Sequence, residues 1–156
     1  MRDSKDSGHS ALRRGRVSLP RQIYHLTVAT MDRFPYFHDF GAACAAARCF
    51  ESRPLLAASQ MLAWVLMPDH AHWLVQLGES DLLDQVVNRL KSGSARETNR
   101  VLGRIGPLWN KGYYDHALRR DEDIKTIARY IVFNPVRAGL VTKIGNYPFW
   151  NAVWLS

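Results

Sequence analysis

Two histidines separated by one residue, His70 and His72, have the spacing of a metal-binding pair. They open the second of two apolar runs in the stretch AWVLMPDHAHWLVQL, residues 63–77, where Met67-Pro68-Asp69 separates the runs. Side chains two residues apart on a β-strand project from the same face, so both imidazoles could bind one metal ion. Two ordinary surface histidines have the same spacing, and the pair alone does not establish a metal site.

A tyrosine and an asparagine four residues apart, Tyr130 and Asn134, could add to this chemistry. On a helix, residues at this spacing address the same point in space. The amide oxygen could complete a metal site with the two imidazoles, and the metal would neutralise charge on a phosphate while the phenol attacks it. The simpler alternative is a tyrosine at the rim of an apolar helix face and an asparagine that ends the helix before Pro135.

Alternating and helical patterns of apolar residues predict the elements that would position these groups. We expect strands at residues 21–30, 60–67, 70–77 and 113–118, and helices at residues 40–52, 80–102 and 121–133. The order strand, helix, strand, strand, helix, strand, helix is that of an α+β, ferredoxin-like split βαβ sandwich. Its sheet would be antiparallel, and the extra C-terminal helix would carry the tyrosine.

Several details of these helices follow from local signals. Ser80 and Asp121 are predicted N-caps, and Ser92-Gly93-Ser94 could kink or split the second helix. Val101 falls on the apolar face of that helix. The aromatic tail, residues 138–156, is predicted to be irregular and to pack back onto the body.

The 156 residues suffice for one domain with a hydrophobic core. Residues 1–20 are polar and basic and are predicted to be a disordered arm, followed by a single folded domain at residues 21–156. The net charge of +7 suits a polyanion such as nucleic acid, although a solvated charged helix flank would look the same. The predicted DNA-binding residues are Arg89, Lys91, Arg96, Arg100, Arg119 and Arg120.

No apolar run reaches the length of a membrane-spanning helix, and the N-terminus lacks the apolar segment of a secretory signal. Cys44 and Cys49 lack the spacing of a zinc knuckle and are typical of free thiols in a reducing compartment. We therefore expect a cytoplasmic protein without a membrane partner, associated with the nucleoid in a prokaryote.

Three segments, in this order and spacing, resemble the REP-associated tyrosine transposases, which are single-tyrosine members of the HUH endonuclease superfamily. The segments are MPDHAHWLVQ, LWNKGYYDHALRRDEDI and ARYIVFNPVRAGLV, and the resemblance covers roughly residues 20–150. The pattern YIxxNPxxAGLV at residues 130–141 is far more specific than the histidine pair.

The resemblance implies a ferredoxin-like fold, dependence on Mg²⁺ or Mn²⁺, and cleavage and strand transfer on single-stranded DNA that contains palindromic hairpins. Within it, His70 and His72 match the metal-binding pair, and Asn134 matches a third, amide ligand. Tyr130 matches the nucleophile that becomes linked to a 5′-phosphate and leaves a free 3′-hydroxyl. Such an enzyme would act as a monomer or a homodimer.

Two rival functions use some of the same residues. A hairpin-binding protein with an inactive site needs only the basic surface. A zinc-dependent hydrolase would use His70 and His72, with Asp69 or His116, to activate water. Neither rival requires the pair formed by Tyr130 and Asn134.

Overall fold

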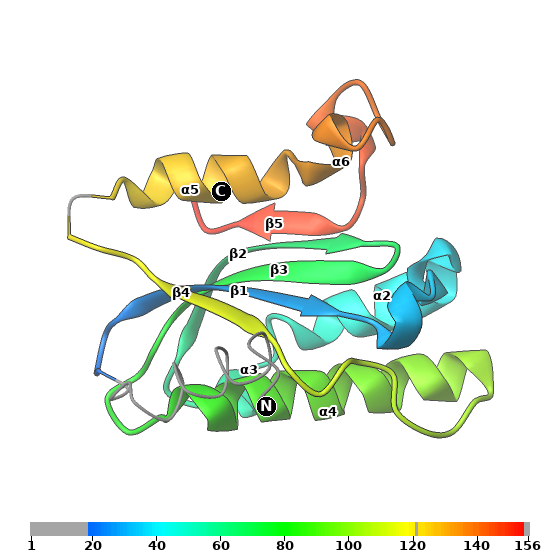
Figure 1. The fold of residues 1–156 in the computed structure, drawn as a ribbon, viewed down its shortest axis with the longest axis horizontal. Helices are drawn as coiled ribbons and strands as arrows, with labels where there is room; N and C mark the ends of the chain where they lie inside the picture. The colour runs from blue at the N-terminus through cyan, green and yellow to red at the C-terminus, as the bar shows by residue number, and fades with distance from the viewer. Residues whose placement is uncertain (1–18, 121, 155–156) are drawn as a thin grey trace, which may run out of the picture.

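In the part of the chain that the structure describes, the sheet is fully antiparallel and has five strands in the order β4-β1-β3-β2-β5 (Figure 1). The computed structural model describes residues 19–120 and 122–154. The strands are β1 (Ile23–Ala29), β2 (Gln60–Met67), β3 (His70–Gln76), β4 (Tyr114–Ala117) and β5 (Trp150–Ala152). The first four have the order of a split βαβ unit, which confirms the predicted ferredoxin-like sandwich.

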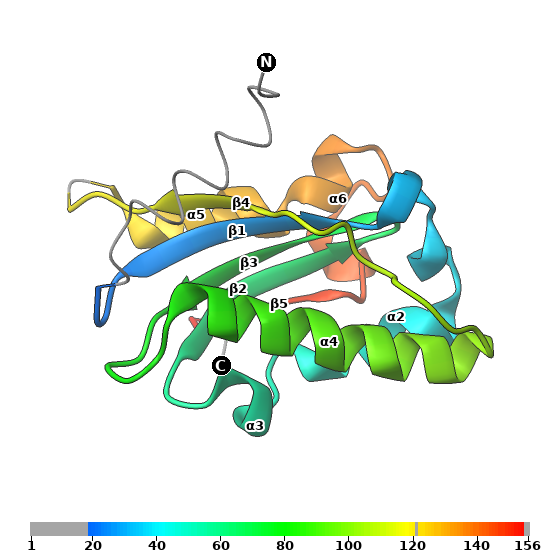
Figure 2. The ribbon, with the colours of Figure 1, turned by 60° about the horizontal axis from the view of Figure 1, so that its bottom comes forward.

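Helices cover both faces of the sheet. They are α2 (Phe40–Cys49), α3 (Arg53–Leu56), α4 (Leu83–Leu102), α5 (Ile124–Val132) and α6 (Asn134–Arg137). Short 3₁₀ turns occupy Met31–Arg33, Tyr36–His38 and Ile144–Asn146. In Figure 1, α2 and α4 lie on one side of the sheet and α5 on the other, and Figure 2 shows α4 running lengthwise along its layer. Within the described residues, every helix is too short or too polar to span a lipid bilayer.

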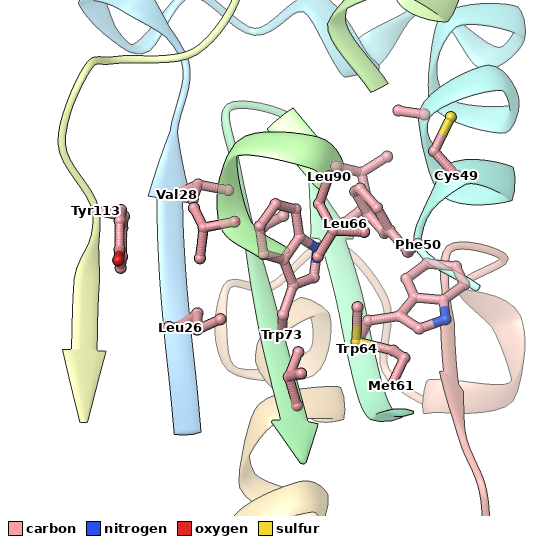
Figure 3. Close-up of a cluster of buried hydrophobic side chains, with 14 of the residues drawn as sticks. Leu26, Val28, Cys49, Phe50, Met61, Trp64, Leu66, Trp73, Leu90 and Tyr113 are labelled. Atoms are coloured by element: carbon pink, nitrogen blue, oxygen red, sulfur yellow. The ribbon is translucent and has the colours of Figure 1, made fainter. Parts of the chain in front are cut away.

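The larger core lies between the sheet and the layer of α2 and α4. Trp73 on β3 is fully buried there and meets the ring of Phe50 edge-on, with 5.2 Å between the ring centroids (Figure 3). Leu26 and Val28 on β1 point into the same core. Because side chains alternate along a strand, burying Trp73 turns its neighbours His72 and Leu74 toward the opposite face.

The second, smaller core lies under α5. Val65 and Leu74 of the sheet are fully buried there against Ala128 and Ile131 of the helix. The helix packs mainly on β2, with smaller contacts to β5 and β3. The same face of β1 and β4 is therefore left partly open, which is where the functional groups described below gather.

Some of the predicted details of α4 are wrong. The helix begins at Leu83 rather than near Ser80, since Asp81 accepts hydrogen bonds from the Ala58 amide and the Ser59 hydroxyl. It is continuous through Gly93, where a side chain would lie 2.6 Å from Cδ1 of Leu55 on the neighbouring helix. The glycine thus permits close packing of α3 rather than a kink. Val101, expected on the buried face, is 49% exposed.

The C-terminal part contains a strand that the sequence does not reveal. Asp123 caps α5 by accepting a hydrogen bond from the Lys125 amide, while the predicted cap Asp121 lies outside the described residues. The tail, expected to be irregular, adds β5 to the edge of β2. Most of the predicted basic arm also falls outside the described residues, since they begin at residue 19.

Candidate active site

The two histidines of β3 lie side by side on the face of the sheet that α5 covers. Their ring centroids are 5.0 Å apart and the rings are almost perpendicular, at 82°. The side chain of His70 is 16% exposed. The prediction that the two imidazoles lie side by side on one face of the strand is therefore confirmed, whereas metal binding by them stays a prediction.

A carboxylate orients the first histidine. Nδ1 of His70 lies 2.7 Å from Oδ1 of Asp69, whose other oxygen pairs with Nε of Arg33 at 3.2 Å. Burial pushes the pKa of Asp69 upward, but the hydrogen bond from His70 and the charge of Arg33 outweigh it and hold the pKa below its usual range. An ionised carboxylate only accepts hydrogen bonds, so Nδ1 of His70 donates, and Nε2 is the ring nitrogen left to bind a metal.

The neighbouring strand orients the second histidine. Nδ1 of His72 lies 3.0 Å from Nε2 of His25 and 3.1 Å from Oγ1 of Thr27, both on β1. Burial, followed by the positive charges of His70, His25 and Arg137, lowers the pKa of His72 to about 3. The ring is therefore neutral at physiological pH, which is the form that binds a metal.

The donor set fits a bound metal ion. Both His70 and His72 use Nδ1 for hydrogen bonds within the protein, and Nε2 of neither ring has a hydrogen-bond partner among the described residues. Partners at the far nitrogen fix the tautomer and orientation of metal-binding histidines in this way. Residues 19–120 and 122–154 offer no cluster of three His, Cys, Asp or Glu side chains for a metal. A third ligand from this part of the chain would have to be of another type, such as an amide.

Tyr130 projects from α5 and is 62% exposed. The guanidinium of Arg137 lies over its ring, with Cζ 3.8 Å from the centroid. The charge of Arg137 also contributes to the lowered pKa of His72. Arg137 of α6 therefore contacts Tyr130 and also acts electrostatically on His72. It relates the predicted nucleophile to the predicted metal-binding histidines.

The four-residue spacing predicted that Tyr130 and Asn134 lie one turn apart on a helix. In the structure they do not share a continuous helix. The helix α5 ends at Val132, and Asn134 begins the separate short helix α6, with Pro135 in its first turn. Proline suits the first turn of a helix because no amide hydrogen is needed there. The side-chain amide of Asn134 donates to the Ile131 carbonyl at 3.3 Å, and its oxygen accepts no hydrogen bond from the described residues.

A groove of about 630 Å³ runs beside the histidines along β1 and the segment before β4. We call it the strand-edge groove; its lining includes Thr27, Met31, Arg33, Trp109, Lys111 and Tyr114. Tyr114 is 64% exposed, and Arg33 also pairs with Asp69. Cations and an exposed ring in one groove suit a single nucleic-acid strand. The sequence reasoning missed Arg33, Lys111 and Arg137, because all three lie outside the regular elements it used.

The predicted DNA-binding residues of α4 lie in the layer opposite the histidines. Arg89 donates to the Leu55 carbonyl and to Asp81, and Arg100 pairs with Glu97. Lys91 donates to the carbonyls of loop residues 110 and 111, at 2.6 and 3.1 Å, and so holds one wall of the strand-edge groove. DNA contacts by Arg89, Lys91, Arg96, Arg100, Arg119 and Arg120 stay predictions.

The lowered pKa of His72 predicts that the metal-free protein loses stability in weak acid. The pKa is about 3 in the folded chain against an ordinary value of 6.5, so between these values the unfolded chain binds a proton that the folded chain does not. The free energy of unfolding should fall by up to about 1.4 kcal/mol per pH unit below 6.5. Urea unfolding in EDTA at a series of pH values measures it. His72→Gln should flatten the slope, and an unchanged slope would contradict this origin.

A family model described as IS200-like transposases matches residues 18–134. A candidate REP-associated tyrosine transposase of Haemophilus influenzae is 28% identical over 142 residues, which cover 81% of this chain and 77% of that protein. The REP-associated tyrosine transposase of Escherichia coli is 30% identical over 87 residues, which cover 56% of this chain and 50% of that protein.

Two solved structures share the fold. A REP-associated tyrosine transposase bound to a REP hairpin matches with a TM-score of 0.67 at 21% identity, over 86% of this chain and 79% of the other. A candidate transposase of Deinococcus radiodurans matches with a TM-score of 0.54 at 25% identity, over 75% of this chain and 93% of the other.

Proposed function

The chain belongs to the family of IS200-like transposases, and on that premise we propose that it cleaves and rejoins single-stranded DNA beside palindromic hairpins. Tyr130 would be the nucleophile and would form a covalent 5′-phosphotyrosine link. The observation that carries the proposal is the arrangement of His70 and His72: both rings have Nδ1 hydrogen-bonded, and neither Nε2 has a partner among the described residues. The contact between Tyr130 and Arg137 supports bringing the phenol to the same place.

The ligands for the metal would be Nε2 of His70, Nε2 of His72 and the amide oxygen of Asn134. Mg²⁺ or Mn²⁺ bound there would supply positive charge to the scissile phosphate. The hydrogen bond from the Asn134 amide nitrogen to the Ile131 carbonyl supports this assignment, because it engages the nitrogen and leaves the oxygen to coordinate a metal. Asp69, His25 and Thr27 would act only by orienting the two rings.

In the cleavage step, the phenolic oxygen of Tyr130 attacks the phosphorus and the bond to the 3′-oxygen breaks. The products are a 5′-phosphotyrosine and a free 3′-hydroxyl, and attack by a 3′-hydroxyl on the same phosphorus reverses the step and joins strands. The guanidinium of Arg137 lies against the ring and would be placed to neutralise charge on the attacked phosphate.

The strand-edge groove would hold the DNA strand that leads to this phosphate. Its cations Arg33 and Lys111 would contact the backbone, and the exposed ring of Tyr114 would stack on a base. Hairpin DNA is proposed as the partner because one of the solved relatives is bound to a REP hairpin.

A gel assay tests the proposed function. The protein is incubated with single-stranded hairpin DNA labelled at its 3′ end and with Mn²⁺. Denaturing electrophoresis should reveal labelled DNA that migrates with the protein. The adduct should be absent in EDTA and with the same sequence as a full duplex. Cleavage without an adduct would instead indicate hydrolysis by metal-activated water, and binding without cleavage an inactive site.

His25 is expected to control the affinity for the metal without touching it. Its ring holds Nδ1 of His72 at 3.0 Å, and loss of such orienting partners lowers metal affinity by about 10–100-fold. Titration of Mn²⁺ into DNA-free protein should show this loss in His25→Ala and a smaller one in Thr27→Val. His38→Ala, which changes an exposed histidine of a 3₁₀ turn, serves as the control. Equal affinity in all four proteins would contradict the role of His25.

A further inference from the structure

A second pocket lies on the flank of α5 that faces β5, between this helix and the C-terminal segment, with a volume of about 230 Å³. We call it the tail pocket; its walls include Phe133, Trp150 and Trp154, and its rim includes Lys125 and Arg129. Neither the histidines nor the strand-edge groove shares a lining residue with it. The candidate active site therefore does not account for the tail pocket.

Aromatic side chains form much of the pocket wall. The indole N–H of Trp150 donates to the Ile144 carbonyl at 3.1 Å, which fixes this ring in place. Phe133 and Trp154 are each 38% exposed, so part of each ring remains open to a ligand. Partly exposed rings around an apolar hollow suit a flat, stacked group.

The positive charges at the rim of the pocket favour a ligand that carries a negative charge. Lys125 and Arg129 are both exposed, and neither forms an ion pair with the described residues. Among the described residues, no carboxylate lines the tail pocket. A flat aromatic group that carries a negative charge fits this combination, and a nucleotide within a DNA strand has both properties.

The position of the tail pocket relates it to the tyrosine. Lys125 and Arg129 lie four residues apart on one flank of α5, and Phe133 follows directly after the end of the helix. Tyr130 lies about 100° further around the helix than Arg129. A helix with its side chains is about 10 Å wide, so a strand attached at Tyr130 could cross it within a few nucleotides.

We infer that the tail pocket binds one unpaired base of the single-stranded DNA next to the cleavage site. The base stacks on Trp154 and Phe133, and Lys125 and Arg129 hold its phosphates. The inference rests on the proposed function for the choice of DNA strand, but it requires neither metal nor cleavage.

The experiment measures binding in EDTA, where no cleavage occurs. Hairpin DNA with a single-stranded flank is prepared intact and as a series in which each unpaired base in turn is replaced by an abasic site, and fluorescence anisotropy gives the Kd. One abasic position should weaken binding to the wild type by about 10-fold, the typical contribution of one stacked base. Trp154→Ala should bind intact DNA about 10-fold more weakly and show no further loss with that abasic DNA.

Two further variants separate stacking from charge. Phe40→Ala removes an exposed ring of α2, 66% exposed on the opposite layer, and should bind as the wild type does. Arg129→Ala should reduce the slope of log K against log salt by about 0.7, the value for one phosphate contact on a single strand. Unchanged thermal unfolding of each variant shows that it is folded.

The inference is wrong if Trp154→Ala binds intact DNA with wild-type affinity, or if the abasic position still weakens its binding. A fluorescent base in the DNA tests the inference with the wild-type protein, in case Trp154→Ala does not fold. 2-Aminopurine at the identified position should be quenched on binding, and the absence of quenching at every position would also overturn the inference. A protein that forms no covalent adduct but passes these tests would refute the proposed function and leave the tail pocket intact.

Discussion

Replacement of Tyr130 by phenylalanine should abolish the covalent protein–DNA adduct and slow strand cleavage by at least about 10³-fold, as expected when an enzyme loses its nucleophile. The change removes a single oxygen atom. Because the phenol is 62% exposed and makes no hydrogen bond with the described residues, its loss should leave the fold and the stack with Arg137 intact. DNA binding without metal should therefore be unchanged, and only the chemical step should be lost.

A second tyrosine provides a matched control. Tyr36 also lies beneath an arginine, with Cζ of Arg104 4.6 Å from its ring centroid, but it packs against the α2–α4 core. Tyr36→Phe should retain the adduct and the rate. Tyr113 and Tyr114 are the competing nucleophiles near the strand-edge groove, and an adduct that survives in Tyr130→Phe but disappears in Tyr114→Phe would move the nucleophile to β4.

Replacement of His72 by alanine should reduce Mn²⁺-dependent cleavage by more than about 100-fold, since loss of an orienting partner alone lowers affinity or activity by up to that factor. The variant should also lose measurable Mn²⁺ binding in the absence of DNA, and His70→Ala should behave similarly. His38→Ala should match the wild type. Full activity of His72→Ala would contradict a metal site at this histidine. Purified wild type that contains stoichiometric zinc and forms no adduct would instead favour a zinc-dependent hydrolase.

Most of the fold could be predicted from the sequence, because β1 alternates and the apolar runs of β2 and β3 are separated by a clear turn. Tyr24, Leu26 and Val28 alternate with polar or partly exposed residues along β1, and this pattern is what places β1 in the sheet. The strand β5 was missed since it has only three residues and obtains its order from pairing with β2 rather than from its own pattern. The start of α4 was misplaced because Asp81, which follows the predicted cap Ser80, is held in a tertiary contact before the helix begins.

The candidate site could be predicted only in part. The period of two places His70 and His72 on one face, but their orientation depends on partners that pairing between β1 and β3 supplies. Thr27 lies opposite His72 in this pairing, and nothing in the local sequence indicates that register. Arg137 contacts Tyr130 only because the chain turns between α5 and α6. Spacing can identify the groups that react, whereas the groups that orient them come from the tertiary structure.

Mass spectrometry of the trapped adduct tests the central claim most directly. After reaction with hairpin DNA and Mn²⁺, digestion with nuclease and trypsin should leave the remaining nucleotide on the peptide YIVFNPVR, residues 130–137, attached through the phenolic oxygen of Tyr130. A nucleotide on the peptide GYYDHALR, residues 112–119, would contradict the account, because it would place the phosphotyrosine on β4 or the residue before it.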